Sequence, residues 1–282
     1  MKHSQRPKYE RRSENIAVLV MILLCIPILF IYFSFFSNAF ILDSTGELTL
    51  QNFRFLYEPI QLSQYTVEPI GKAFRNTVLF TAVATTLEVT ISCMAGYALA
   101  RMEFTGKRVI SFSLLSLRLF PGVLLLIGVL YVLLHLGILN PLTGVIVVAI
   151  ALRLPGSTFI IRNFFAGIPQ DIENSALVDG CNRLTAFFQV IIHMVKPGLA
   201  SISIFAFMSA WSNYLLFNVL IFNTKTPVLA TYLRVLSRND QMIADYGVFA
   251  AMALVYMLPV LVFFFISQRQ LMQGTISGGK GI

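Results

Sequence analysis

Six long runs of apolar residues are the feature that most constrains how this chain can fold. Each run is long enough for a helix that crosses roughly 30 Å of hydrocarbon, which takes about 20 residues. Because unpaired backbone groups are costly in lipid, such runs are expected to form α-helices. The predicted spans are Ile16–Phe36, Thr77–Ala100, Val109–Leu136, Leu142–Phe165, Gly198–Phe222 and Gly247–Ser267. We therefore predict an all-α membrane protein with six transmembrane helices.

The composition supports lipid as the surrounding medium. Of the 282 residues, 57% are hydrophobic and 12% are charged, whereas a soluble domain has about 25% charged residues. The net charge is +8, but the cations form one basic tail and otherwise flank the apolar runs. A nucleic-acid surface needs a basic face interleaved with aromatic residues. We therefore exclude nucleic acid as a partner and expect the lipid bilayer instead.

The distribution of Lys and Arg predicts the orientation in the membrane. Most of these residues fall on one side if the amino terminus is cytoplasmic, and both ends of the chain are basic. The first apolar run is longer than the 7–15 residues of a signal-peptide core, which favours an uncleaved anchor. We predict a basic cytoplasmic tail at 1–15, a first span with a periplasmic loop at 16–72, a transmembrane domain at 73–269 and a cytoplasmic tail at 270–282. Neither outside segment, Asn38–Lys72 nor Asn223–Tyr246, is apolar enough for a substantial core of its own.

The segment between the fourth and fifth spans predicts a short helix, a turn and a second short helix. Pro169 suits the first turn of a helix, and Asp171 and Glu173 suit the positive end of its dipole. Gly180 is a natural stop, and Asn182 can cap a second helix that runs to about Ile192. On the predicted topology this element is cytoplasmic.

A rigid helix below the membrane can dock onto another protein and transmit its rigid-body movement. The chain has no G-x-x-x-x-G-K-[ST] loop, so ATP hydrolysis would belong to a separate subunit. The alternative is an ordinary amphipathic loop with no partner.

An ordered set of short motifs favours the docking interpretation. Asn174-Ser175-Ala176, followed by Asp179-Gly180, lies in the frame Glu-Ala-Ala, three residues, Gly, nine residues and a branched apolar residue. The other motifs, in chain order, are Phe74–Thr77, Gly96–Arg101, Phe120–Gly122, Leu136–Asn140, Phe164-Phe165 with Ile168-Pro169, Ala210-Trp211 and Gly274–Gly281. From about Ala73 to its end, the chain resembles the membrane subunits of binding-protein-dependent ABC importers, specifically maltose-type carbohydrate permeases of the second-subunit kind.

This resemblance implies a non-enzymatic subunit in the cell (inner) membrane, translocating a sugar or oligosaccharide by alternating access. It implies three kinds of partner besides lipid and substrate: a homologous second permease subunit, two ATPase subunits that carry ATP and Mg, and an extracytoplasmic solute-binding protein. No cofactor is expected on this chain. The coupling residues that the motif implies are Glu173, Asn174, Ser175, Ala176, Asp179 and Gly180. Because Asn174 replaces the usual glutamate, we predict that Glu173 or the backbone around Gly180 carries docking instead.

Three ionisable residues fall inside predicted spans at similar depth: Glu88, Arg118 and Arg153. Such groups cost at least about 2.5–3.5 kcal/mol in lipid and usually face a partner or a water-filled path. One interpretation is a structural Glu88–Arg118 pair. Another places an unpaired arginine on the translocation path, favouring a substrate with acidic groups, and a third is snorkelling or a misplaced span. Pro121 should kink the third span, and Pro27, Pro155 and Pro259 could act alike.

Two other function classes lack their sequence signals. A secondary transporter driven by an ion gradient predicts inverted repeats and paired broken helices, which we do not find in the sequence. A membrane-embedded enzyme predicts a cluster of catalytic residues, but no G-x-S-x-G nucleophile motif occurs. The three cysteines and three histidines have no metal-binding spacing. The ion-driven transporter remains the alternative to the importer.

Overall fold

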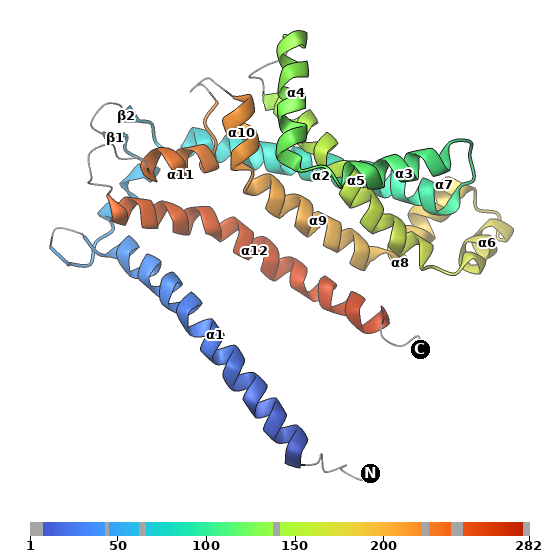
Figure 1. Ribbon diagram of the computed structural model, residues 1–282, viewed down its shortest axis with the longest axis horizontal. Helices are drawn as coiled ribbons and strands as arrows, with labels where there is room; N and C mark the ends of the chain where they lie inside the picture. The colour runs from blue at the N-terminus through green and yellow to red at the C-terminus, as the bar shows by residue number, and fades with distance from the viewer. Residues whose placement is uncertain are drawn as a thin grey trace. The chain divides into compact units, whose positions relative to one another are not determined.

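The computed structural model of the chain describes residues 8–42, 45–61, 66–137, 142–221, 226–237 and 245–278 (Figure 1). The outer parts of both predicted tails, 1–7 and 279–282, and the Ile138–Asn140 part of one motif lie outside these residues. The chain divides into two compact units, Met1–Pro69 with Leu236–Tyr256, and Ile70–Val235 with Met257–Ile282.

The first unit joins the first span to segments from both predicted outside loops. Its elements are α1 (Lys8–Phe40), the 3₁₀ helix η1 (Gln51–Leu56), the antiparallel pair β1 (Ile60–Gln61) and β2 (Thr66–Val67), and the start of α12 (Tyr246–Gly278). The apolar side chains of α1 from Ile16 to Tyr32 are exposed in the chain alone, as expected of a helix that faces lipid. Buried side chains of this unit include Phe55 from the first outside segment, Leu236 from the second and Met252 from α12. Both outside segments therefore contribute residues to the buried interior of this unit.

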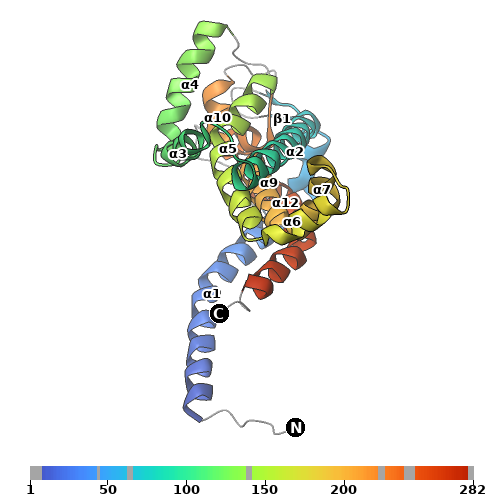
Figure 2. The ribbon, with the colours of Figure 1, turned by 90° about the vertical axis from the view of Figure 1, so that its right-hand side faces the viewer.

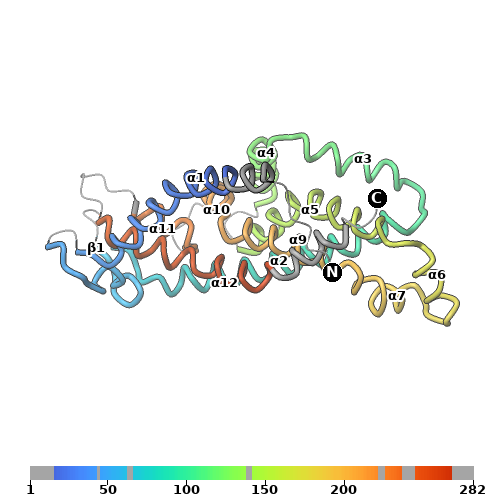
Figure 3. Tube along the Cα trace, turned by 90° about the horizontal axis from the view of Figure 1, so that it is seen from below, coloured from blue at the N-terminus to red at the C-terminus, as the bar shows by residue number. Residues whose placement is uncertain are grey.

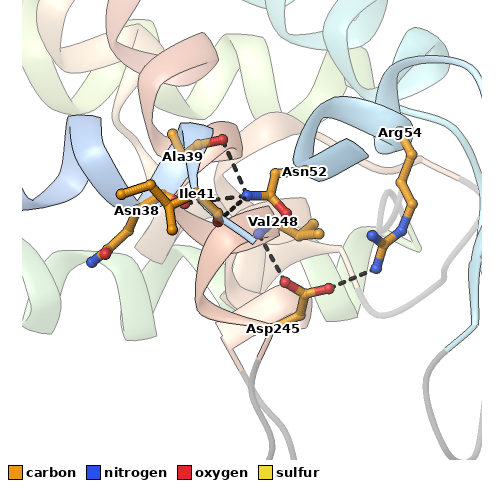
Figure 4. A network of polar contacts seen from close by, with 7 residues as sticks. All are labelled: Asn38, Ala39, Ile41, Asn52, Arg54, Asp245 and Val248. Atoms are coloured by element: carbon orange, nitrogen blue, oxygen red, sulfur yellow. Dashed lines mark hydrogen bonds and ion pairs between the residues drawn. The ribbon is translucent and has the colours of Figure 1, made fainter. Parts of the chain in front are cut away.

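Asn52 fixes the end of α1 (Figure 4). Its Nδ2 donates hydrogen bonds to the carbonyl oxygens of Asn38 (3.2 Å), Ala39 (3.2 Å) and Ile41 (2.9 Å). The last four carbonyls of a helix have no partner within the helix, so a side-chain donor satisfies them. Asn52 is 1% exposed, and its amide therefore serves as a buried cap for α1.

Asp245 fixes the start of α12 in the same region (Figure 4). Its Oδ1 accepts a hydrogen bond of 3.1 Å from the backbone N–H of Val248, which is the usual N-cap contact. Its Oδ2 accepts a 2.6 Å hydrogen bond from Arg54 Nη2, from a residue in η1. The two outside segments are thus joined by an ion pair.

The second unit is a helical bundle in which α2 packs most extensively against α5 and α9 (Figure 2). Its helices are α2 (Gly71–Arg101), α3 (Lys107–Leu117), α4 (Gly122–Leu136), α5 (Leu142–Ala166), α6 (Gln170–Val178), α7 (Arg183–Ala186), the π-helix η2 (Phe187–Ile191), α8 (Ile192–Met194), α9 (Lys196–Trp211), α10 (Tyr214–Leu220), most of α11 (Leu229–Ser237) and the remainder of α12. The two helices α2 and α5 therefore form its centre.

Small residues let α2 approach α5 closely. Ala84, Ser92 and Gly96 are buried on one face of α2, at spacings of four or eight residues. A Cβ atom added to Gly96 would lie 2.5 Å from Ile161 Cγ2 and 3.1 Å from the backbone nitrogen of Arg162. Small residues at such spacing allow tight packing of helices in membranes, where the hydrophobic effect does not drive association.

The first turns of α2 hold the segment that leads into α11. Asn76 Nδ2 donates a 2.9 Å hydrogen bond to the carbonyl of Pro227, and Thr77 Oγ1 accepts one of 2.9 Å from the backbone N–H of Leu229. Both residues belong to a motif on which the family resemblance depends. Their structural role is to hold the loop before α11 against the first turns of α2.

The third predicted span is broken at its proline. Helices α3 and α4 meet at an angle of 106° (Figure 1). Pro121 has no N–H to donate and disfavours helical geometry at Phe120, which explains the interruption. The predicted kink at Pro121 is confirmed. In contrast, Pro27 and Pro155 lie inside helices that continue through them, as does Pro259.

The fifth predicted span is also interrupted, which the hydropathy pattern did not indicate. Helix α9 ends at Trp211, and α10 starts at Tyr214. Ser212 Oγ donates to the carbonyl of Met208 (2.7 Å), and Asn213 Oδ1 accepts from the backbone N–H of Leu216 (3.3 Å). Local bonds between side chain and backbone of this kind compete with helix continuation.

The number of membrane spans depends on how the bent helices are counted. By length and composition, four of the described helices can cross a membrane: α1 from Ile16, α2, α5 and α12 as far as Gln268. The count rises to six if α3 with α4, and 183–194 with α9, are each one span. The third predicted span is thus strongly bent. The second bend, of 79°, lies just before the fifth predicted span, where 183–194 meets α9.

Candidate functional site

The predicted helix–turn–helix element between the fourth and fifth spans is present. Helix α6 begins after Pro169, which takes the N-cap position one residue before the predicted one. Gly180 has φ +90°, its N–H donates to Leu177 O (3.2 Å), and the N–H of Cys181 donates to Ala176 O (3.0 Å). This bond pattern is a Schellman stop, in which a left-handed residue terminates the helix. The predicted stop at Gly180 is confirmed.

The second short helix starts where the sequence predicts. Asn182 Oδ1 accepts hydrogen bonds from the backbone N–H (2.8 Å) and the hydroxyl (2.9 Å) of Thr185. From Arg183 the chain continues as α7, η2 and α8 to Met194. The turn between α6 and α7 thus has a defined geometry at both of its ends.

The predicted coupling residues divide into exposed and buried groups. Asn174, Ser175, Asp179 and Gly180 are exposed, whereas Glu173 and Ala176 are buried. The structure does not place Glu173 where a partner could reach it, because its carboxylate points back into the bundle. Of the two docking candidates expected from the sequence, only the backbone around Gly180 is accessible.

Glu173 joins α6 to the end of α2. Its Oε1 accepts a 2.6 Å hydrogen bond from the Tyr97 hydroxyl, and its Oε2 lies 3.6 Å from Arg101 Nε. The side chains of Glu173 and Arg101 are each 8% exposed. Arg101 Nη2 also donates to the carbonyl of Ile168, just before α6. We call Tyr97, Arg101 and Glu173 the anchor cluster.

An apolar cluster packs against the anchor cluster. The ring centroid of Tyr97 lies 4.7 Å from that of Phe187 and 5.6 Å from that of Phe165. Ile191 and Ile202 are fully buried in the same cluster. Since these residues come from α2, α5, η2 and α9, the helix–turn–helix element is packed against the centre of the bundle.

The turn itself exposes large apolar side chains. Val178 is 87% exposed and Leu184 is 70% exposed. They lie on either side of Gly180, at the end of the bundle where α6 and α7 project (Figure 3). Exposed apolar side chains on a rigid turn are suited to fill a hydrophobic groove on another protein.

Glu88 pairs with Arg153 rather than with Arg118. Arg153 Nε lies 3.4 Å from Glu88 Oε2, and Ser157 Oγ donates a 2.6 Å hydrogen bond to Glu88 Oε1. Arg153 Nη2 donates to the carbonyls of Phe205 (3.1 Å) and Ala206 (2.8 Å). The predicted Glu88–Arg118 pair is therefore wrong. Its charges had been matched by depth alone, whereas pairing depends on which helix faces meet.

Arg118 lies at the break of the third span. It is the C-cap of α3, so the expected position in the middle of a straight span is wrong. Its guanidinium carbon is 5.5 Å from the ring centroid of Phe159, a distance typical of a cation–π contact. Arg118 is exposed and forms no ion pair within the part of the chain that the structure describes.

Sequence reasoning did not assign roles to Tyr97, Arg101 and Ser157. Tyr97 and Arg101 stand in the motif Gly96–Arg101, so a signal was present without a stated role. Ser157 lies four residues after Arg153 and hence on the same face of α5. A helical-face analysis of α5 could have grouped Ser157 with Arg153, but it could not have supplied the partner on α2.

Comparison with known proteins places most of the chain in one family. Residues 88–275 match the family described as binding-protein-dependent transport system inner membrane component. The chain is 31% identical to the diacetylchitobiose uptake system permease protein NgcG of Streptomyces coelicolor, over 95% of this chain and 87% of that protein. It is 29% identical to the maltodextrin transport system permease protein MdxG of Bacillus subtilis, over 86% of this chain and 84% of that protein.

A solved structure has the same fold. It is described as a bacterial ABC transporter involved in the import of the acidic polysaccharide alginate. The TM-score is 0.78 at 19% identity, and the match covers 94% of this chain and 98% of the solved chain. At this identity the likeness establishes the fold alone.

Proposed function

The chain belongs to the family of binding-protein-dependent transport system inner membrane components, and from this we propose that it imports a sugar or oligosaccharide as one of two membrane subunits of an ATP-driven importer. It is a multi-pass protein of the inner membrane. The permease relatives named for diacetylchitobiose and maltodextrin support a carbohydrate as the substrate. The exposed turn between α6 and α7, anchored by Glu173, is the observation that carries the proposal.

In the proposed topology the chain crosses the membrane six times and both termini are cytoplasmic. Helices α3 and α4 together form the third span, α9 and α10 together form the fifth, and the α6–α7 turn then faces the cytoplasm. A homologous permease subunit completes the pore, two ATPase subunits supply ATP and Mg, and a solute-binding protein delivers the substrate from outside.

The turn and the anchor cluster have separate roles in this mechanism. Val178, Leu184 and the backbone around Gly180 contact the ATPase, whereas Glu173 receives the movement of α6 and passes it to α2 through Tyr97 and Arg101. A buried ionic contact suits this role because separating its two partners would leave buried charges uncompensated. Helices α6 and α2 therefore move together. Asn174 in place of the usual glutamate is consistent with docking through shape and apolar contact.

Replacing Gly180 with proline tests the docking role. Proline cannot adopt φ +90°, and it removes the N–H that donates to Leu177. We expect ATPase co-purification and ATP-dependent uptake to fall more than about tenfold, since the misfit of a proline costs about 3 kcal/mol and about 1.4 kcal/mol already corresponds to tenfold.

Gly180→Asn is the matched control because asparagine tolerates the left-handed conformation. It should retain most of the ATPase and most of the uptake. Full assembly and transport by Gly180→Pro would reject the docking role. Uptake that survives ATP depletion but collapses with the ion gradient would favour the ion-driven alternative.

We further propose that Arg118 faces the translocation path and binds acidic groups of the substrate. Glu88 is 2% exposed and is paired with Arg153, so the prediction of a path-lining charge is kept for Arg118. At a helix break inside the membrane, an exposed arginine is stable only beside water, a partner or a ligand.

The charge of the transported sugar tests Arg118. Arg118→Gln should lower uptake of a uronic-acid oligosaccharide at least about tenfold relative to a neutral oligosaccharide of equal length, because a charged hydrogen bond contributes about 1.5–3 kcal/mol. Arg118→Lys, which keeps the charge, is the matched control. Equal losses for both sugars in competition uptake assays would reject selection by charge.

A further inference from the structure

A basic cavity lies beside the start of α3, away from the anchor cluster and from Arg118. Its volume is about 660 Å³, and its walls include Lys107, Arg108, Arg162 and Ser111. Arg162 comes from the last turns of α5, and the other three come from α3. The start of α3 and the end of α5, which form these walls, lie at the same end of the second unit as α6 (Figure 1).

The cavity keeps a net positive charge. Its one acidic wall residue, Glu103, accepts a 2.8 Å hydrogen bond from Lys107 Nζ. This hydrogen bond and the charge of Lys107 hold the pKa of Glu103 below its usual value, so the carboxylate stays ionised and offsets Lys107. Arg108 and Arg162 form no ion pair with the described residues.

Two further features favour an anion in the cavity. The Nε atom of Arg162 is buried and has no hydrogen-bond partner among the described residues. The amino-terminal turn of α3, an 11-residue helix, has no side-chain cap and contributes Lys107 and Arg108 to the cavity wall. Free N–H groups at a helix start bind phosphate oxygens, and guanidinium groups bind them through paired donors.

An apolar surface continues from the cavity along α3. This helix buries none of its residues. Val109 is 68%, Phe112 is 72% and Leu115 is 47% exposed, and their spacing of three residues forms a stripe that starts at the cavity wall. A ligand with a phosphate and long hydrocarbon chains fits both surfaces at once.

We propose that this cavity binds the headgroup phosphate of an anionic phospholipid, whose acyl chains lie along the exposed stripe of α3. Basic pockets between helices at the cytoplasmic surface are suited to such lipids. The cavity faces the cytoplasmic leaflet in the topology given above. The site does not depend on which sugar is transported.

Native mass spectrometry of the full chain in detergent tests the proposal. The chain is titrated with dioleoyl phosphatidylglycerol and, separately, with dioleoyl phosphatidylcholine. Phosphatidylglycerol should bind more tightly, and replacing Arg108 and Arg162 together with glutamine should weaken its binding about thirtyfold without changing phosphatidylcholine binding. The single variant Arg108→Gln, at an exposed position, should weaken it about fivefold.

Lys196→Gln is the matched control. It removes an exposed cation at the start of α9, outside the cavity wall. It should leave phosphatidylglycerol binding unchanged. An equal loss in this control, or equal affinity for both lipids, would overturn the proposal in favour of general surface attraction.

Two competition experiments separate other occupants. Inorganic phosphate at the lipid's concentration should not displace phosphatidylglycerol, and displacement would overturn the lipid assignment in favour of a soluble phosphate ligand. Added ATPase subunits should likewise leave the lipid bound. Its release by the ATPase would assign the cavity to the partner protein and reject the proposal.

Discussion

Replacing Glu88 with leucine should destabilise the chain far more than replacing Glu88 and Arg153 together. Glu88 is 2% exposed, and its carboxylate contacts Arg153 and Ser157. Removing it leaves a guanidinium in the membrane interior without its counter-charge, which costs about 3–5 kcal/mol for a buried pair. Arg153→Met in the same chain removes the uncompensated charge and should restore most of that loss.

The measurement is thermal unfolding of the purified chain in detergent, with the single and double variants side by side. Glu103→Gln is the control. The Glu103 carboxylate that pairs with Lys107 is exposed, and exposed ion pairs contribute little to stability. A double variant as unstable as Glu88→Leu would show that the pair does not act as a unit.

Glu173→Leu should uncouple ATP hydrolysis from transport. The substitution removes the acceptor for the Tyr97 hydroxyl and the counter-charge of Arg101. Both of these side chains are buried beside Glu173. A cost of about 3–5 kcal/mol for the broken pair is enough to release α6 from α2. We expect ATP hydrolysis without matching uptake, measured as substrate transported per ATP hydrolysed.

The neighbouring residue supplies the control for this experiment. Asn174 is exposed, so Asn174→Ala should leave the anchor cluster and the coupling ratio intact. Labelling of Cys181 by a water-soluble maleimide, in a Cys25→Ser background, measures the loosening directly, since Cys181 follows Gly180 in the turn. An unchanged labelling rate and coupling ratio in Glu173→Leu would contradict the anchoring role.

Hydropathy was sufficient to locate the apolar segments, because a helix in lipid needs a long apolar run whatever its neighbours are. The bend at Pro121 was also predicted, because proline acts locally on the helix. The break after Trp211 could not be predicted in this way. It depends on hydrogen bonds from Ser212 and Asn213 to nearby backbone, and their strength relative to a continuous helix is not encoded in hydropathy.

The candidate site was predicted in position but not in orientation. Local capping signals gave the stop at Gly180 and the cap at Asn182, because each acts within a few residues. The inward direction of Glu173 and the Glu88–Arg153 pair depend on the rotation of α2 against α5 and α6, which one sequence does not determine. The contact between Arg54 and Asp245 likewise joins residues 191 positions apart.

The two ends of α2 are both fastened to segments far away in the sequence. Near one end, Asn76 and Thr77 hold the backbone before α11, and near the other, Tyr97 and Arg101 hold α6. A helix of 31 residues is about 46 Å long and resists compression along its axis. This single helix can therefore carry a displacement from one of its ends to the other, without any chain of intermediate side-chain rearrangements.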